Sequence, residues 1–407
     1  MLDNYRTVFR TPGSAAFCAA AFVMRSAIAL YPLGLVLLIS LRTGHYSFAG
    51  LLSGIYVISS GAGNPVLGRY VDRYGQTRLL LPFTAIHVAA IGTMALLAEL
   101  NAPDWTLIPP TAIGGFFYLA VGSLVRARWS YVLKNQAELT TAYSLEATLD
   151  ELIFVLGPVI ATVIATQLDP TLVPVLGCLV VGGGAIWLSR LTGSAPPPHP
   201  QGSERTRSAL RFRGVPLVFA AMICTGGFFA SAEITIIAFC GERGSAGVSG
   251  AVLACLSLGS ASSGFVYGAR HWGPPLLQRF WWQSILFGSM PVLLLFATTI
   301  PMLALISFVV GLATAPLLIT AFGLVERIVP DRVLTEGMAW MTTGLSLGYG
   351  LFAGVVGRIA DTHGARPAFS VAIACGLVEA VAAFAVYSML RGAPLPGDAA
   401  DAAALPT

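Results

Sequence analysis

Four acidic residues stand inside long apolar stretches of the sequence, where a carboxyl group needs a partner or a cavity. Glu233 lies in "FFASAEITII", and Glu146, Asp150 and Glu151 lie in "YSLEATLDELIFVLGP". An ionisable group within hydrocarbon costs on the order of 3 kcal/mol, so it usually marks a functional or paired site. Apolar surroundings favour the protonated form of a carboxyl group. We therefore predict reversible proton binding at Glu233 first, with Asp150, Glu151 and Glu146 as further candidates.

One arginine also lies well inside an apolar stretch. Arg25, in "VMRSAIALYPLG", stands about 20 Å along a helix from Pro12 at 1.5 Å per residue. It could bind an anionic group or form a structural salt bridge, and the sequence leaves both open. Pro32 and Gly34 could interrupt the helix just after it. A direct pair with Glu233 would need helix tilt or a bridging water.

Glu146 has a simpler alternative than proton binding. Glu146 and Asp150 are four residues apart and therefore share one helix face, whereas Glu151 points elsewhere. Arg126 and Arg128 end the preceding apolar stretch. A charge pair between these two helices is the favoured interpretation of Glu146, and it leaves proton binding open for Asp150 and Glu151.

Aromatic and polar side chains of the apolar stretches could line a central cavity, although such residues more often serve packing. His87 and Glu379 are predicted to have structural roles instead. The cavity candidates are Tyr31, Asn64, Tyr118, Trp340 and Tyr349.

The composition excludes an ordinary soluble protein. Of the 407 residues, 56% are hydrophobic and 10% are charged, against about 25% charged residues in soluble domains. The net charge of +4 comes from arginines in short connectors, which indicates membrane orientation rather than nucleic-acid binding. The six cysteines lack metal-ligand spacing, and no phosphate-binding loop or hydrolase motif occurs. We therefore predict neither an enzyme nor a bound metal or cofactor.

Twelve apolar runs are long enough, at about 20 residues, to cross a bilayer as helices. Their continuity excludes the alternating pattern of a β-barrel. With the N-terminus inside, most arginines fall in inside connectors, so both termini are predicted to be cytoplasmic. The runs are 14–40, 46–67, 79–99, 107–127, 139–167, 170–190, 215–240, 248–268, 278–299, 301–324, 335–357 and 367–390.

The runs divide into two related halves. Gly50 corresponds to Gly250, and Gly68 to Gly268, at an offset of about 200 residues, which predicts two parallel six-helix repeats. We expect a first bundle over 1–192, a flexible cytoplasmic linker over 193–214, a second bundle over 215–391 and a disordered tail over 392–407, because the linker and tail are rich in proline and small residues.

The charged connector "GRYVDRYGQTR" resembles the helix 2–3 loop motif of the major facilitator superfamily. Its Gly68, Asp72, Arg73, Gly75 and Arg78 match that motif, while Thr77 departs from it. The resemblance implies a twelve-helix transporter that works by alternating access, with this loop as a gate at the helix ends. The plain alternative is a hydrophilic turn that only ends a helix.

A second resemblance concerns the direction of transport. Gly157 and Pro158 partly resemble an element of antiporter-type members, although an ordinary helix kink is an equal alternative. The prediction is a bacterial efflux transporter, a monomer in the inner (plasma) membrane, that exports a small apolar or amphipathic compound in exchange for protons. One alternative is a proton-coupled importer of a small organic anion, with Arg25 as its ligand. Another is a membrane scaffold or sensor that transports nothing.

Overall fold

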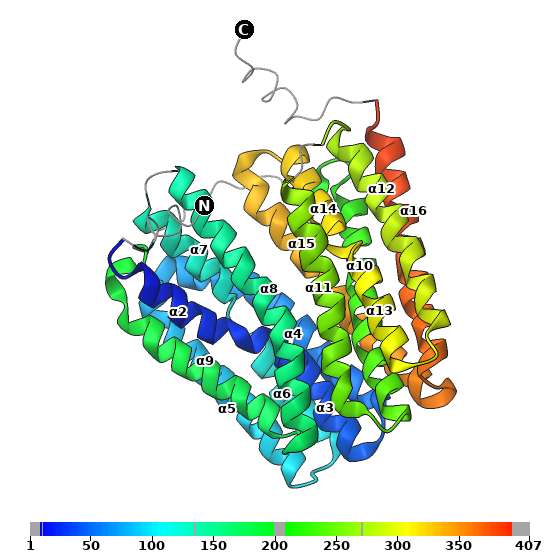
Figure 1. Cartoon of the computed structure of the whole chain (residues 1–407). Coiled ribbons are helices and arrows are strands. Elements are labelled where there is room, and N and C mark those ends of the chain that lie inside the picture. Colours follow the sequence, from blue (N-terminus) through cyan, green and yellow to red (C-terminus); the bar gives the residue numbers. More distant parts are fainter. Residues whose placement is uncertain (1–8, 10, 134–135, 199–207, 270–271, 393–407) are drawn as a thin grey trace. The chain divides into compact units, whose positions relative to one another are not determined.

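The protein is described here by a computed structural model that covers residues 9, 11–133, 136–198, 208–269 and 272–392 (Figure 1). Every regular element in these ranges is a helix. Each of the twelve predicted runs coincides with one long helix or with two or three shorter ones in succession. The elements up to the predicted linker are α2 (Ser14–Arg25), η1 (Ser26–Ala29), α3 (Tyr31–Thr43), α4 (Tyr46–Tyr74), α5 (Gln76–Glu99), η2 (Asp104–Leu107), α6 (Ile108–Phe116), α7 (Val121–Val132), α8 (Gln136–Gln167), α9 (Leu172–Arg190) and η3 (Thr192–Ser194).

The remaining helices begin within the predicted linker 193–214, of which 199–207 lie outside the described residues, as do 393–407 of the predicted tail. They are η4 (Ala209–Arg211), α10 (Val215–Glu242), η5 (Ala246–Val248), α11 (Ser249–Ala269), α12 (Leu276–Ser289), η6 (Met290–Phe296), α13 (Ile300–Gly311), α14 (Thr314–Ile328), α15 (Asp331–His363) and α16 (Ala365–Leu390).

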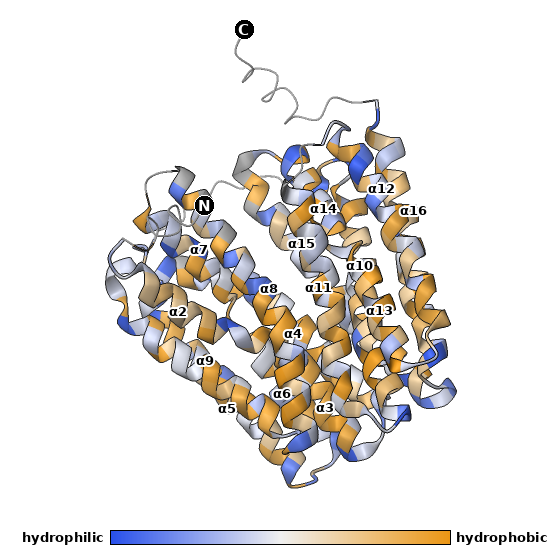
Figure 2. Ribbon diagram, in the orientation of Figure 1, coloured by the Kyte–Doolittle hydropathy of each residue, from blue (hydrophilic) through white to orange (hydrophobic). Residues whose placement is uncertain are grey.

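Ten of the helical segments are long and apolar enough to cross a membrane. The other two predicted runs are α4 and the succession of α12 and η6. Many large apolar side chains are exposed on the helices, including Leu179, Phe265 and Val381. Figure 2 shows hydrophobic residues along the helices and many of the hydrophilic ones at helix ends and in connectors. Since such a surface requires a lipid solvent, the chain is an all-α membrane protein that crosses the bilayer several times.

The chain forms two compact units. The first contains residues 1–44 and 55–202, and the second contains residues 45–54 and 203–407. Helix α4 therefore contributes its first turns to the second unit and the rest of its length to the first. At its start, the amides of Tyr46 and Ser47 donate to the carboxylate of Asp361 at 2.6 and 2.7 Å. This carboxylate on α15 satisfies two of the amides that a helix N-terminus leaves unpaired.

In the first unit, the first predicted run is interrupted immediately after Arg25. The α-helix ends at Arg25, a short 3-10 helix follows, and α3 begins at Tyr31. Pro32 occupies the first turn of α3, where its missing N–H costs no hydrogen bond. The expected interruption is thus present, and Arg25 is the last residue of the α-helix before it.

In the second unit, α10 and α15 touch backbone to backbone. A Cβ on Gly226 of α10 would overlap the carbonyl group of Leu345, and a Cβ on Gly348 of α15 would overlap that of Ile223. Both helices carry candidate site residues, Glu233 on α10 and Tyr349 on α15, so this crossing sets the distance between the two helices.

We expect Gly226→Ala to lower the free energy of unfolding by about 1–3 kcal/mol, because the added methyl group forces the two backbones apart. The matched control is Gly92→Ala, since no described atom lies within 4 Å of a Cβ at Gly92. That control should change stability by no more than about 1 kcal/mol. Unfolding of the purified protein in detergent measures both effects. Equal effects of the two substitutions would contradict this account of the crossing.

Candidate functional site

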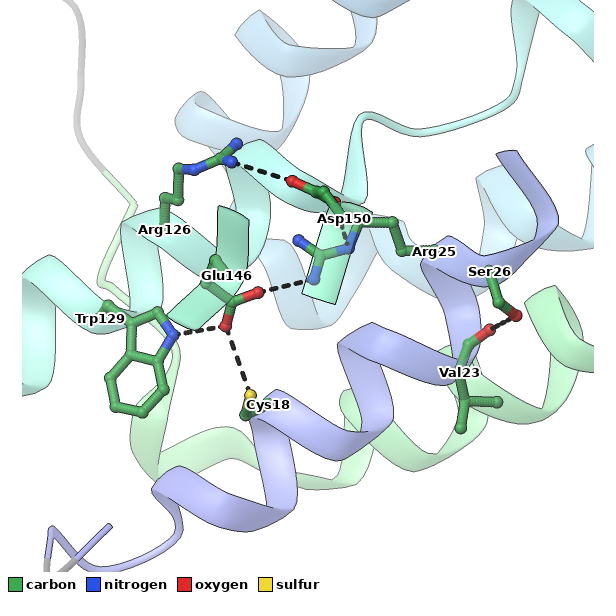
Figure 3. Close-up of polar contacts among 8 residues, drawn as sticks. All are labelled: Cys18, Val23, Arg25, Ser26, Arg126, Trp129, Glu146 and Asp150. Atoms are coloured by element: carbon green, nitrogen blue, oxygen red, sulfur yellow. Dashed lines mark hydrogen bonds and ion pairs between the residues drawn. The ribbon is translucent and has the colours of Figure 1, made fainter. Parts of the chain in front are cut away.

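Arg25 and Glu146 form a fully buried ion pair in the first unit. Arg25 Nη2 lies 2.8 Å from Glu146 Oε2, and the side chains are 4% and 0% exposed. The other carboxylate oxygen, Oε1, accepts hydrogen bonds from Trp129 Nε1 at 2.7 Å and from Cys18 Sγ at 3.4 Å. Side chains of two helices, α2 and α7, thus hold Glu146 of α8, and both of its oxygens are occupied (Figure 3).

Asp150 bridges two arginines beside this pair. Its Oδ1 lies 3.0 Å from Arg25 Nε, and its Oδ2 lies 3.1 Å from Arg126 Nη2. Figure 3 shows the Asp150 carboxylate between the two guanidinium groups, one from the end of α2 and the other from α7. The side chains of Asp150 and Arg126 are 28% and 42% exposed, so this half of the cluster is more accessible than Glu146.

The favoured pairing of Glu146 with Arg126 and Arg128 is corrected by this geometry. Glu146 pairs with Arg25, which is 121 residues away in sequence, and Arg126 pairs with Asp150. The interruption after Arg25 brings its guanidinium to α8, which sequence neighbourhood could not indicate. Trp129 and Cys18 were not among the candidates, because neither residue type marks a carboxylate partner by itself.

Arg128 has a structural role instead. It is completely buried and donates to Gln76 Oε1 at 2.9 Å, to Ser194 Oγ at 2.8 Å and to the carbonyls of Leu188 and Leu191. These acceptors come from the start of α5, the end of α9 and the turn after it. Arg128 therefore fastens three segments at one end of the first unit.

Glu233 is the leading acidic candidate of the second unit and lies on α10. It lies nine residues before the end of α10, about 13 Å along the axis. Its Oε1 is buried without a hydrogen-bond partner among the described residues. The Tyr349 hydroxyl lies close to this carboxyl group and within 3.2 Å of Ser53 Oγ, on the first turns of α4. Glu233, Tyr349 and Ser53 thus connect α10, α15 and α4, and Ser53 was not a candidate from sequence.

The other acidic candidates differ in their surroundings. Glu151 follows Asp150 on α8 and is half-buried. Glu379 on α16 is completely buried, and its Oε1 accepts a hydrogen bond from Ser284 of α12 at 2.9 Å. Glu379 Oε2 has no partner among the described residues.

The predicted cavity candidates lie in different surroundings. Tyr31 is fully buried, and its hydroxyl lies 2.8 Å from His87 Nε2, while His87 Nδ1 lies 2.7 Å from the Gly114 carbonyl. The rings of Tyr31 and His87 also pack against Tyr118. Both ring nitrogens of His87 are occupied, which agrees with its predicted structural role.

Asn64 and Trp340 lie apart from these clusters. Asn64 Oδ1, on the first-unit part of α4, is buried without a partner among the described residues. Trp340 Nε1, on α15, donates to Glu336 at 3.2 Å, and its ring packs edge-on against Phe219 at 5.6 Å.

The charged loop is a tight reversal between α4 and α5. Gly75 joins the helices with φ of 90°, a conformation that favours glycine. Arg73 and Arg78 are exposed, and Arg73 stacks over Tyr74 at 5.3 Å. No described atom lies within 4 Å of a Cβ on Gly68. The side chain of Asp72 lies outside the described residues.

An exposed charged cluster lies elsewhere in the first unit. Arg42 pairs with Glu99 and donates to Thr171 Oγ1 at 2.7 Å. Hydrogen bonds from the Thr171 side chain and backbone lower the pKa of Asp169.

As for metals, no three His, Cys, Asp or Glu side chains meet in a possible ion site within the described part of the chain.

Comparison with known proteins decides the family. Residues 13–290 match the family model of the Major Facilitator Superfamily. The chain belongs to this superfamily. It is therefore a secondary transporter and not an enzyme, and the resemblance of its loop motif to this superfamily is confirmed.

Solved structures agree with this fold. Human organic anion transporter MFSD10 (TETRAN) is 14% identical, covers 91% of this chain and 98% of its own, and gives a TM-score of 0.64. The nucleoside transporter NupG is also 14% identical, with coverage of 93% and 99% and a TM-score of 0.64. The POT family transporter PepTSo is 10% identical, with coverage of 94% and 98% and a TM-score of 0.68. At these identities the similarity concerns the fold alone.

A curated protein of Thermoproteus tenax, described as an uncharacterized 38 kDa protein in a 23S RNA operon, is 31% identical over 134 residues. The match spans 31% of this chain and 35% of that relative. It adds no information about the substrate.

Proposed function

We propose that this superfamily member couples proton movement to the export of a small apolar or amphipathic compound across the inner (plasma) membrane. It works as a monomer by alternating access, with both termini in the cytoplasm as the arginine distribution predicts. The observation that carries the proposal is the carboxyl group of Glu233, which lies within a membrane-spanning helix with an oxygen that has no partner among the described residues.

The surroundings of Glu233 suggest how protonation acts on the protein. Burial without a countercharge makes the ionised form dependent on water or on hydrogen bonds. The Tyr349 hydroxyl is the nearby donor, and it shares the Ser53 hydroxyl of α4. Gain or loss of a proton at Glu233 therefore changes the hydrogen bonds between α10, α15 and the first turns of α4.

A second candidate function is the proton-coupled import of a small organic anion. One observation favours it. Arg25 and Arg126 direct guanidinium groups toward the same space in the first unit, and an arginine pair is a good receptor for a carboxylate.

Transport measurements in proteoliposomes test both candidates. A drug-susceptibility and metabolite-export screen of a deletion strain first supplies the compounds. Counterflow under an imposed pH gradient then gives the direction. Substrate movement in the direction opposite to the proton flow supports export. Substrate movement in the same direction as the proton flow supports import. Absence of flux for every compound from the screen would overturn both and favour the scaffold alternative.

A further inference from the structure

The guanidinium groups of Arg25 and Arg126 both lie close to Gly122. A Cβ on Gly122, in the first turn of α7, would lie 3.1 Å from Arg126 Nη1 and 3.8 Å from Arg25 Nη1. Arg25 Nη1 is buried and has no hydrogen-bond partner among the described residues. A buried guanidinium nitrogen without an acceptor is costly, so its donor capacity indicates a missing anionic group.

We propose that Arg25 and Arg126, whose guanidinium groups lie next to Gly122, form the receptor for the carboxylate of an amphipathic substrate. In the substrate-free protein Asp150 occupies this receptor. This inference rests on the second candidate function and specifies its substrate class. Asp150 binds one nitrogen of each guanidinium group with its two oxygens, as a substrate carboxylate would.

The difference in burial between Glu146 and Asp150 determines which of the two carboxylates leaves the guanidinium groups when the substrate binds. Glu146 is held by Arg25, Trp129 and Cys18, and it is 0% exposed. Asp150 forms ion pairs with Arg25 and Arg126 and is 28% exposed. Asp150 is therefore the carboxylate that leaves, whereas Glu146 keeps Arg25 in position.

Charge balance links this exchange to a proton. Arg25 and Arg126 carry two positive charges, and Glu146 and Asp150 carry two negative ones, so the cluster is neutral. If an anion replaces Asp150 at the guanidinium groups, Asp150 must bind one proton for the cluster to stay neutral. The carboxylate and one H⁺ then enter together, and both leave together.

Other groups that face Asp150 act on this proton as well. Arg25 of α2 and Arg126 of α7 pair with Asp150, and Glu146 and Glu151 are the acidic neighbours on its own helix. Tyr118, in the connection between α6 and α7, also faces Asp150. The pH dependence of anion binding is therefore assigned by removing the Asp150 carboxylate itself.

Equilibrium binding of radiolabelled benzoate to the purified full-length protein tests the receptor, with benzamide as the uncharged competitor of the same shape. Wild-type protein should bind benzoate more tightly at mildly acidic than at mildly alkaline pH, because protonated Asp150 releases the arginines. Asp150→Asn should bind benzoate at least about tenfold more tightly at alkaline pH, which corresponds to about 1.4 kcal/mol. Its binding should also lose the pH dependence.

The controls separate charge from folding. Arg126→Gln should weaken benzoate binding at least about tenfold. At position 25, Arg25→Lys is the variant to use if larger changes prevent folding, because it keeps a positive charge beside Glu146. Asp169→Asn, an exposed acid of the same unit, should bind like wild type. Binding of benzamide as tight as that of benzoate, or unchanged benzoate binding in Asp150→Asn, would overturn the receptor. Because binding is measured without a gradient, this result is independent of whether the protein performs proton-driven flux.

Discussion

Glu233→Gln should abolish accumulation of substrate driven by a pH gradient, while exchange of substrate across the membrane continues. Glutamine keeps the shape of the side chain and can still bond with Tyr349, but it cannot carry a proton. With one coupled proton, each unit of pH difference can support about a tenfold substrate gradient. In the variant this gradient should fall to about one at any pH difference, since the two fluxes are no longer linked.

Glu379→Gln is the matched control for this experiment. Glu379 is also a buried carboxyl group of the second unit with one oxygen that has no partner among the described residues, but its hydrogen bond from Ser284 joins α12 to α16 and does not involve α4, α10 or α15. Its substitution should leave the accumulated gradient close to that of wild type. If Glu233→Gln still concentrates substrate, the proton is carried elsewhere and the proposed coupling site is wrong.

Arg25→Gln should cause the largest loss of stability among single substitutions in the first unit. It leaves the completely buried carboxylate of Glu146 without its countercharge. Breaking a buried ion pair by removal of one partner typically costs about 3–5 kcal/mol. Unfolding of the purified protein, followed by fluorescence in detergent, measures the loss. The double variant Arg25→Gln with Glu146→Gln should recover much of it, because no unpaired buried charge remains.

Arg42→Gln provides the comparison with an exposed ion pair. Arg42 pairs with Glu99, whose side chain is 55% exposed. Exposed pairs contribute about 0.2–1 kcal/mol, so this substitution should have a small effect. Similar losses for Arg25→Gln and Arg42→Gln would show that burial does not control the strength of the Arg25 pair.

The sequence was sufficient to predict the helices, because a continuous apolar run of this length satisfies its backbone hydrogen bonds within a bilayer only as a helix. It also predicted that Arg25 and Glu146 each need a partner. It could not pair them, because the partners lie on α2 and α8 and meet only when the bundle folds. The sequence neighbours Arg126 and Arg128 were the obvious choice for Glu146, and they bind Asp150 and Gln76 instead.

Some members of the candidate site give no sequence signal. Ser53 is one of many serines in apolar helices, and only its distance of 3.2 Å to the Tyr349 hydroxyl distinguishes it. Gly122 likewise resembles the other glycines of the chain until a Cβ is placed beside the two guanidinium groups. Polar contacts between distant helices depend on helix rotation and on interruptions such as the one after Arg25, which periodicity alone does not determine.

The equal numbers of positive and negative side chains around Arg25 have an electrical consequence. Moving one elementary charge through the membrane field requires about 2.3 kcal/mol per 100 mV. A cluster of two arginines and two carboxylates that changes its exposure as a whole moves no net charge. This cluster should therefore contribute no difference between the rates at which the empty first unit reorients in polarised and in depolarised vesicles.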